Sequence, residues 1–139
     1  MLFRSKRVLL ELGGKAPMVV LRDADLDRAA AAASFGAFFH QGQICMSTER
    51  IVVDQAVSEQ LAEKLADRAR ALPVGDPREQ TTAIGPLINA DAVARVSSLV
   101  QDAVAKGARA LSGGEADGPC FPPTVLAGVT PEMRVYAEE

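Results

Sequence analysis

The segment around Cys45 contains the residue types that covalent catalysis by a thiol needs. Cys45 stands in the run 41–47 (Gln-Gly-Gln-Ile-Cys-Met-Ser), between an apolar helical stretch and a stretch of β-branched residues. Gly42 lets the chain leave the helix and turn. Backbone N–H groups in such a turn can stabilise a thiolate and, during a reaction, an oxyanion. The alternative is that Cys45 is a small buried hydrophobic residue, as most free cysteines are.

A second segment offers a carboxylate inside an apolar run. Glu11 lies between Leu10 and Leu12 and is followed by Gly13 and Gly14. Apolar surroundings disfavour the ionised form of a carboxyl group, so that its pKa rises toward the range of a general base. Glu11 is therefore a candidate general base. The alternative is a glutamate on an edge strand that points into water.

The other reactive side chains exclude several kinds of site. Cys45 and Cys120 are the two cysteines and His40 is the one histidine, and no CxxC or HExxH spacing occurs, so we expect no metal site. Cys120 stands among prolines, which give a thiol no activating setting. His40 precedes Cys45 by five positions, but no acidic residue is placed to orient its ring. We therefore assign no role to His40 or Cys120.

Strands and a helix must position the two reactive segments. Runs rich in Val and Leu predict strands over Arg7–Leu12 and Pro17–Leu21, joined by a tight bend at Gly13-Gly14. Aspartates then offer N-cap oxygens to a helix over Asp27–Phe39. The β-branched residues that follow the cysteine predict a strand over Thr48–Val53.

The second half of the chain continues this alternation. Apolar residues at helical spacing predict one amphipathic helix with leucines from 61 to 72 and another from 93 to 104 that ends near Gly107. Short strands are predicted over Ala108–Leu111 and Thr124–Leu126. Strands that alternate with helices predict an α/β fold with an at least partly parallel sheet.

The helix over Asp27–Phe39 does not suit an isolated small domain. Its residues 29–39 are uncharged, consist mainly of alanine and phenylalanine, and are apolar on every side. Such a helix is usually enclosed within a larger body. We therefore expect the chain to be a piece of something bigger, and a last stretch without turn or helix-stop residues agrees with this.

Composition excludes further classes of partner. The chain has 139 residues and a net charge of −3, so we expect one domain and no nucleic-acid partner. Its longest uncharged apolar run has 11 residues, too few to span a membrane, and no signal peptide is evident. We expect a cytoplasmic protein with free thiols.

The two reactive segments together resemble a known family. Glu-Leu-Gly-Gly-Lys at 11–15 is followed, 34 positions after its glutamate, by the cysteine of Gly-Gln-Ile-Cys at 42–45. This pair resembles the active-site signatures of the aldehyde dehydrogenase superfamily. Five later segments resemble further conserved motifs of the family in the same order. They are 74–77 (Val-Gly-Asp-Pro), 84–88 (Ile-Gly-Pro-Leu-Ile), Gly113-Gly114, 123–126 (Pro-Thr-Val-Leu) and Glu138-Glu139. Residues 38–50 are most similar to members acting on aromatic aldehydes such as benzaldehyde, salicylaldehyde or vanillin.

The resemblance implies roles for four residues. Cys45 would be the nucleophile that forms a thiohemiacetal and then a thioester with the aldehyde carbon. Glu11 would be the general base for the hydrolytic water. Glu139 would hold the nicotinamide ribose, and the backbone at Leu12 would touch the nicotinamide.

The resemblance also implies an incomplete enzyme. Residues 1–139 would form a partial, nucleophile-bearing catalytic domain, three-layered with a mostly parallel sheet, without the cofactor-binding and oligomerisation parts. NAD or NADP would serve the full-length enzyme, but we expect neither to bind this chain tightly, and the isolated chain to be inactive toward its small-molecule aldehyde. One alternative is a non-catalytic half that docks on a partner chain. Another is a cofactor-free thiol esterase using Cys45 and Glu11. The possible protein partners are the missing half of the enzyme or further copies of this chain in a homo-oligomer.

Overall fold

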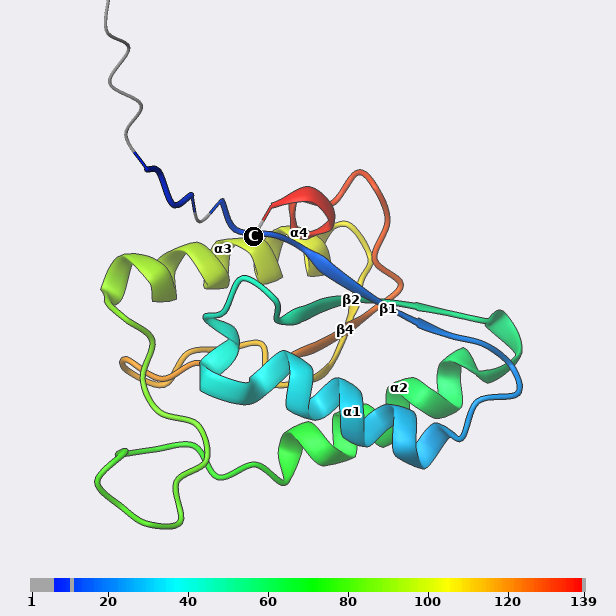
Figure 1. Ribbon diagram of the computed structural model, residues 1–139, viewed down its shortest axis with the longest axis horizontal. Coiled ribbons are helices and arrows are strands. Elements are labelled where there is room, and N and C mark those ends of the chain that lie inside the picture. The colour runs from blue at the N-terminus through cyan, green and yellow to red at the C-terminus, as the bar shows by residue number, and fades with distance from the viewer. Residues whose placement is uncertain (1–6, 11, 139) are drawn as a thin grey trace, which may run out of the picture.

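The computed structural model describes residues 7–10 and 12–138 (Figure 1). Two residues with predicted roles, Glu11 and Glu139, lie outside this described part.

The described residues form four helices and four strands, together with two short 3₁₀ turns. In chain order they are β1 (Ala16–Val20), α1 (Leu26–Phe38), a 3₁₀ turn (Phe39–Gly42), β2 (Thr48–Val53), a second 3₁₀ turn (Gln55–Val57), α2 (Ser58–Arg70), α3 (Ala90–Ala105), β3 (Arg109–Ser112), β4 (Val125–Ala127) and α4 (Arg134–Ala137). The predicted strand over Thr48–Val53 is confirmed, and the predicted helix over Asp27–Phe39 agrees with α1 to within one residue at each end.

Capping residues explain where α1 and α3 begin. The carboxylate of Asp25 accepts hydrogen bonds from the N–H groups of Asp27 and Arg28 at the start of α1. The side-chain oxygen of Asn89 accepts from Ala92 at the start of α3. Both caps satisfy backbone donors that have no partner within the first helical turn.

The strands pair in two ways, and this corrects the predicted sheet. β1 and β2 are parallel, with Ala16 opposite Thr48 and Val20 opposite Val53, whereas β3 and β4 are antiparallel. The expectation of a mostly parallel sheet is therefore wrong for the described part, which has one two-stranded sheet of each kind. A parallel pair needs a crossover, which α1 supplies between β1 and β2, but only a loop joins β3 to β4.

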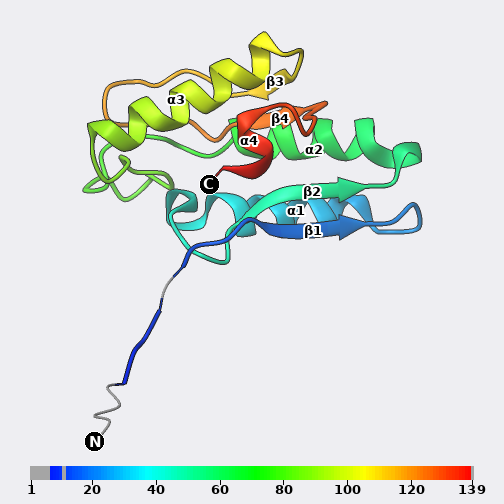
Figure 2. The same ribbon diagram turned by 90° about the horizontal axis from the view of Figure 1, so that it is seen from above.

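Helices lie on both sides of the strands (Figure 1), although Val19 of β1 and Val52 of β2 remain more than half exposed. Figure 1 shows α1 and α2 together on one side of β1, β2 and β4, with α3 and α4 on the other; Figure 2 shows α1 behind the β1–β2 pair. The core between these elements contains small residues of α1 and leucines of α2: Ala29, Ala30, Ala33, Leu61 and Leu65. Alanine faces let the helices approach each other and the sheet closely.

Two apolar stretches are less enclosed than the sequence predicts. Residues 7–10 and Leu12 form no strand, which corrects the prediction over Arg7–Leu12, and the apolar side chains there are exposed. A strand needs a partner, and no described segment pairs with this one. Phe35 on α1 and Phe39, which directly follows α1, are 67% and 58% exposed, so one face at the end of the apolar helix remains uncovered in this chain.

No helix in the described ranges has the length and apolar content required to cross a lipid bilayer.

Candidate active site

Cys45 occupies a turn directly before β2. The Ser47 N–H donates to the Ile44 carbonyl at 2.9 Å and closes a turn whose central residues are Cys45 and Met46. The closing bond of such a turn uses neither of the central N–H groups. Cys45 is exposed and its thiol is free. The nucleophile predicted from the sequence is therefore accessible, with its own backbone donor beside it.

Strained backbone delivers the chain from α1 to this turn. His40, Gln41 and Gly42 follow one another with φ of 55°, 57° and 71°. Residues other than glycine seldom adopt this left-handed conformation, and such strain collects at functional sites. The predicted helix end is confirmed, and His40 lies on the exposed side of this bend.

Two glutamines fasten the Cys45 loop to a neighbouring segment. The Gln43 side-chain oxygen accepts a hydrogen bond from the Ile88 N–H at 3.0 Å. With its amide oxygen facing Gly85, Gln41 accepts from the Gly85 N–H at 2.9 Å. Sequence reasoning gave no role to these glutamines. The only signal was that 84–88 resembled a family landmark whose spatial neighbour the sequence alone does not reveal.

The segment that follows Glu11 runs beside the Cys45 turn. A Cβ placed on Gly14 would lie 3.2 Å from the carbonyl oxygen of Cys45. Both segments then enter the sheet at the same end, because β1 and β2 are parallel and their first residues, Ala16 and Thr48, lie opposite each other. The structure therefore brings the backbones of both predicted catalytic segments together. Glu11 itself lies outside the described residues, so its approach to the thiol stays a prediction.

The leucines around Glu11 do not form the apolar surroundings expected from the sequence. Leu10 is exposed and Leu12 is 83% exposed. Any apolar enclosure of the predicted base must therefore come from elsewhere than these two side chains. Leu12 lies in irregular backbone, and its predicted contact with the nicotinamide stays a prediction.

Residues 136–138 lie beside the same end of the sheet, where β1 and β2 begin. Lys15 Nζ donates to the Glu138 carbonyl at 2.6 Å and to Glu49 Oε2 at 2.7 Å. Arg50 donates to the Tyr136 carbonyl and lies over the Tyr136 ring at 4.0 Å from its centroid. Glu139, the predicted ribose-binding residue, follows directly but is outside the described part of the chain.

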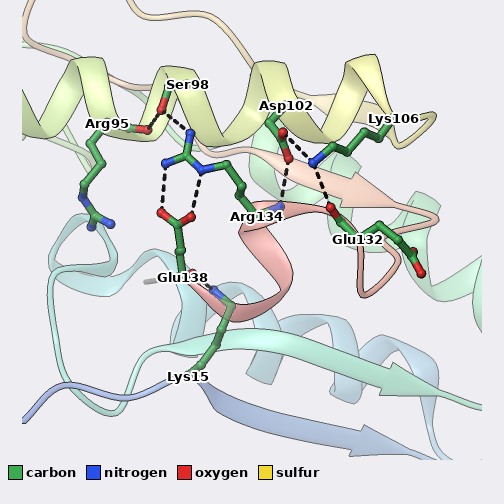
Figure 3. A network of polar contacts seen from close by, with 8 residues as sticks. All are labelled: Lys15, Arg95, Ser98, Asp102, Lys106, Glu132, Arg134 and Glu138. Atoms are coloured by element: carbon green, nitrogen blue, oxygen red, sulfur yellow. Dashed lines mark hydrogen bonds and ion pairs between the residues drawn. The ribbon is translucent and has the colours of Figure 1, made fainter.

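Charged contacts stabilise the short helix α4 and its junction with α3 (Figure 3). The Arg134 guanidinium binds the Glu138 carboxylate at 2.8 and 2.9 Å and keeps the pKa of Glu138 below its ordinary value. Lys106 binds the Asp102 carboxylate, which also accepts from the Arg134 N–H, and both hydrogen bonds lower the pKa of Asp102. Both carboxylates therefore remain ionised to lower pH than a free carboxylate does.

Cys120 has a different setting. It is half-buried and free, and its backbone forms a bridge with Asp117 through hydrogen bonds of 2.9 and 3.0 Å. It serves as a natural control for thiol experiments on Cys45.

Comparison with known proteins identifies the family. The aldehyde dehydrogenase family model matches residues 3–139. The chain belongs to the aldehyde dehydrogenase family. It is 52% identical over 134 residues to a vanillin dehydrogenase of Pseudomonas fluorescens and 46% identical over 135 residues to a salicylaldehyde dehydrogenase of Pseudomonas putida. The similarity to dehydrogenases of aromatic aldehydes, expected from residues 38–50, is thereby confirmed.

Solved aldehyde dehydrogenase structures share the backbone fold of this chain. The salicylaldehyde dehydrogenase of Pseudomonas putida G7, complexed with salicylaldehyde, is 45% identical with a TM-score of 0.90, over 94% of this chain and 27% of that one. A succinate-semialdehyde dehydrogenase of Burkholderia pseudomallei also gives a TM-score of 0.90 at 44% identity, over 94% and 28%. The match to each curated relative named above spans 96% of this chain but 28% of the relative. This aldehyde dehydrogenase chain thus corresponds to part of a longer enzyme architecture.

Proposed function

We propose that this chain is the nucleophile-bearing part of an NAD(P)+-dependent dehydrogenase that oxidises an aromatic aldehyde to a carboxylic acid. The observation that supports this most strongly is the approach of Gly14 to the Cys45 carbonyl at the start of two parallel strands. It brings the segment that leads from the proposed base alongside the turn that carries the proposed nucleophile. The names of the relatives, vanillin and salicylaldehyde dehydrogenases, favour an aromatic substrate.

Cys45 would act first. Its thiolate adds to the aldehyde carbon, and the carbonyl π electrons move to oxygen to give a thiohemiacetal oxyanion. The Cys45 N–H, which the closing bond of its turn does not use, is available to stabilise that negative charge. A covalent intermediate of this kind divides one difficult reaction into two easier ones.

Glu11 would act in the second half of the reaction. Once the thiohemiacetal carbon has lost its hydride, a thioester links the substrate to Cys45. Glu11 takes a proton from a water molecule whose oxygen attacks the thioester carbonyl. The C–S bond then breaks, which releases the carboxylic acid and restores the Cys45 thiolate.

The cofactor would meet the chain at Leu12 and Glu139. NAD(P)+ supplies the hydride acceptor when it is bound. The described residues fit its nicotinamide end, because Leu12 is exposed in irregular backbone and Lys15 holds the carbonyl that precedes Glu139. No glycine-rich pyrophosphate loop of the GxGxxG kind occurs in the sequence. We therefore propose that the isolated chain does not oxidise aldehydes.

A chimaeric enzyme tests this function. The matching segment of the Pseudomonas putida G7 salicylaldehyde dehydrogenase is replaced by this chain, and NADH formation from salicylaldehyde is measured. We expect activity that falls at least about a thousandfold in Cys45→Ala. Cys120→Ala is the matched control and should retain activity. Activity that survives Cys45→Ala in a chimaera of unchanged melting temperature would refute the proposal.

The exposed phenylalanine rings at the end of α1 and directly after it support a second, non-catalytic role. Phe35 and Phe39 stack at 5.1 Å between centroids and are both more than half exposed, so this helix face is suited to docking against the rest of the enzyme. Co-expression of the chain with the remaining parts of a relative should give a complex in pull-down experiments. No association at micromolar concentration would exclude this role.

A further inference from the structure

Lys15 joins three segments that are far apart in the sequence. Its ammonium group donates to the Glu49 carboxylate at 2.7 Å and to the Glu138 carbonyl at 2.6 Å, across 34 and 123 residues. The side chains of Lys15 and Glu49 are only 15% and 26% exposed. Shielding from water strengthens such charge-assisted contacts, so the junction is firmer than an ordinary surface ion pair.

Each of these segments leads to a residue of the proposed site. Lys15 follows Glu11 by four positions, Glu49 follows Cys45 by four positions, and Glu138 directly precedes Glu139. The lysine therefore connects the base segment, the nucleophile segment and the ribose-binding segment at one point.

The contact with Glu138 fixes the chain path rather than a side chain. The Glu138 carboxylate is already bound by Arg134, which extends from the same helix, whereas Lys15 holds the main-chain carbonyl (Figure 3). A bond to the main chain fixes the backbone at Glu138 directly, independently of where the Glu138 side chain lies.

The helix before Glu139 needs such external support. α4 has only four residues, and a helix of this length does not hold its own shape in water. Arg50 holds it at Tyr136, and α3 holds it through Asp102 and Arg134. Among these contacts, Lys15 is the one nearest Glu139.

We propose that Lys15 is a positioning residue that sets the Glu138 carbonyl, at the end of α4, relative to the segment that carries Cys45. This inference rests on the proposed function of Cys45 and Glu139. Glu49 balances the charge of Lys15, so that the ammonium can be held under little solvent exposure and directed at the carbonyl.

Tyrosine fluorescence of the isolated chain tests whether Lys15 anchors α4. The sequence has one tyrosine and no tryptophan, so Tyr136 alone reports on α4. Lys15→Met should raise the acrylamide quenching constant of Tyr136 about twofold or more, because α4 loses an anchor and opens locally. Lys64→Met is the matched control, since it breaks the Lys64–Asp27 ion pair elsewhere on the surface. Quenching that is equal in the two variants would overturn the proposal.

A second variant guards against loss of folding. If Lys15→Met lowers the far-ultraviolet helix signal, Lys15→Gln replaces it, since glutamine is shorter and uncharged but still polar. Wild-type quenching in a folded Lys15→Gln variant would also overturn the proposal.

The NAD+ affinity of the chimaera tests whether the Lys15 anchor affects the proposed cofactor site. Loss of the anchor should weaken NAD+ binding about tenfold, as expected for one charge-assisted contact, while the rate of Cys45 alkylation stays unchanged. Unchanged NAD+ affinity together with activity that still depends on Cys45 would overturn the role of Lys15 and leave the proposed function intact. Activity independent of Cys45 would instead refute the proposed function.

Discussion

The Cβ position of Gly14 lies 3.2 Å from the carbonyl oxygen of Cys45. Only a residue without a side chain allows this approach undisturbed, because most Cβ contacts are longer. The glycine therefore serves the packing of two reactive segments, and its φ lies outside the left-handed region that would otherwise require glycine.

Gly14→Ala should lower the stability of the chain and disturb the Cys45 turn. The added methyl group forces the Cys45 carbonyl to move by a few tenths of an ångström. We expect Gly14→Ala to be about 1 kcal/mol less stable than Gly75→Ala, which meets only an ordinary 3.6 Å contact with Thr82. Urea unfolding and the alkylation rate of Cys45 measure the two effects. Equal unfolding midpoints for both variants would contradict the close approach.

The packing of α1 on β2 depends on Gly36 in the same way. An alanine Cβ there would lie 2.6 Å from Thr48 Oγ1, closer than real contacts allow. Gly36→Ala should therefore cost about 2 kcal/mol. Adding Thr48→Ala should recover part of that cost, because it removes the obstructing hydroxyl. A double-mutant cycle with no coupling between the two positions would show that the contact is absent.

Acid should release α4 from α3. One contact between the two helices is the hydrogen bond from the Arg134 N–H to Asp102 of α3, and Lys106 followed by this N–H lowers the pKa of Asp102. Within the α4 segment, Arg134 lowers the pKa of Glu138 and supports the short helix. Because both values are lower in the folded chain than in the unfolded one, the stabilisation is complete above the unfolded values. It is lost as the pH falls from about 4 through the lowered values.

Tyr136 quenching against pH measures this release. The quenching constant should rise below about pH 4 in the wild type. It should be higher at neutral pH and less dependent on pH in the Asp102→Asn, Glu138→Gln double variant. A flat wild-type profile down to pH 2 would contradict a role for these carboxylates in docking α4.

Replacement of the proposed base should separate the two halves of the reaction. In the chimaera, Glu11→Gln keeps the size of the side chain but removes the proton acceptor. We expect a rapid first turnover of NADH followed by a loss of steady-state rate of about a hundredfold or more, with an acyl group trapped on Cys45. Mass spectrometry of the quenched protein detects that adduct. Normal steady-state turnover would exclude Glu11 as the base.

The isolated chain should behave as a protein with uncovered apolar surface. Phe35 on α1, Phe39 directly after α1 and Val19 on β1 are all more than half exposed. We expect binding of a hydrophobic dye or self-association, and a Phe35→Gln, Phe39→Gln variant should show less of both. A monodisperse wild-type monomer that leaves the dye dark would contradict this prediction.

The sequence by itself determined the local elements and the family. Periodic apolar residues predicted α2 and α3, and N-cap aspartates predicted the start of α1. β-branched residues predicted β2 within its observed bounds, and the cysteine and glutamate signatures indicated an aldehyde dehydrogenase. These features are encoded by neighbouring residues, whose spacing sets which side of a helix or strand is apolar.

Only the tertiary structure decided how the segments meet. The antiparallel β3–β4 pair, the irregular path of residues 7–10 and the exposed face of α1 all depend on which partner is available, and local spacing does not encode a partner. The bond from Lys15 to the Glu138 carbonyl joins positions 123 residues apart. It leaves no mark in the sequence, because every residue carries a carbonyl and the identity of residue 138 does not determine which donor reaches it.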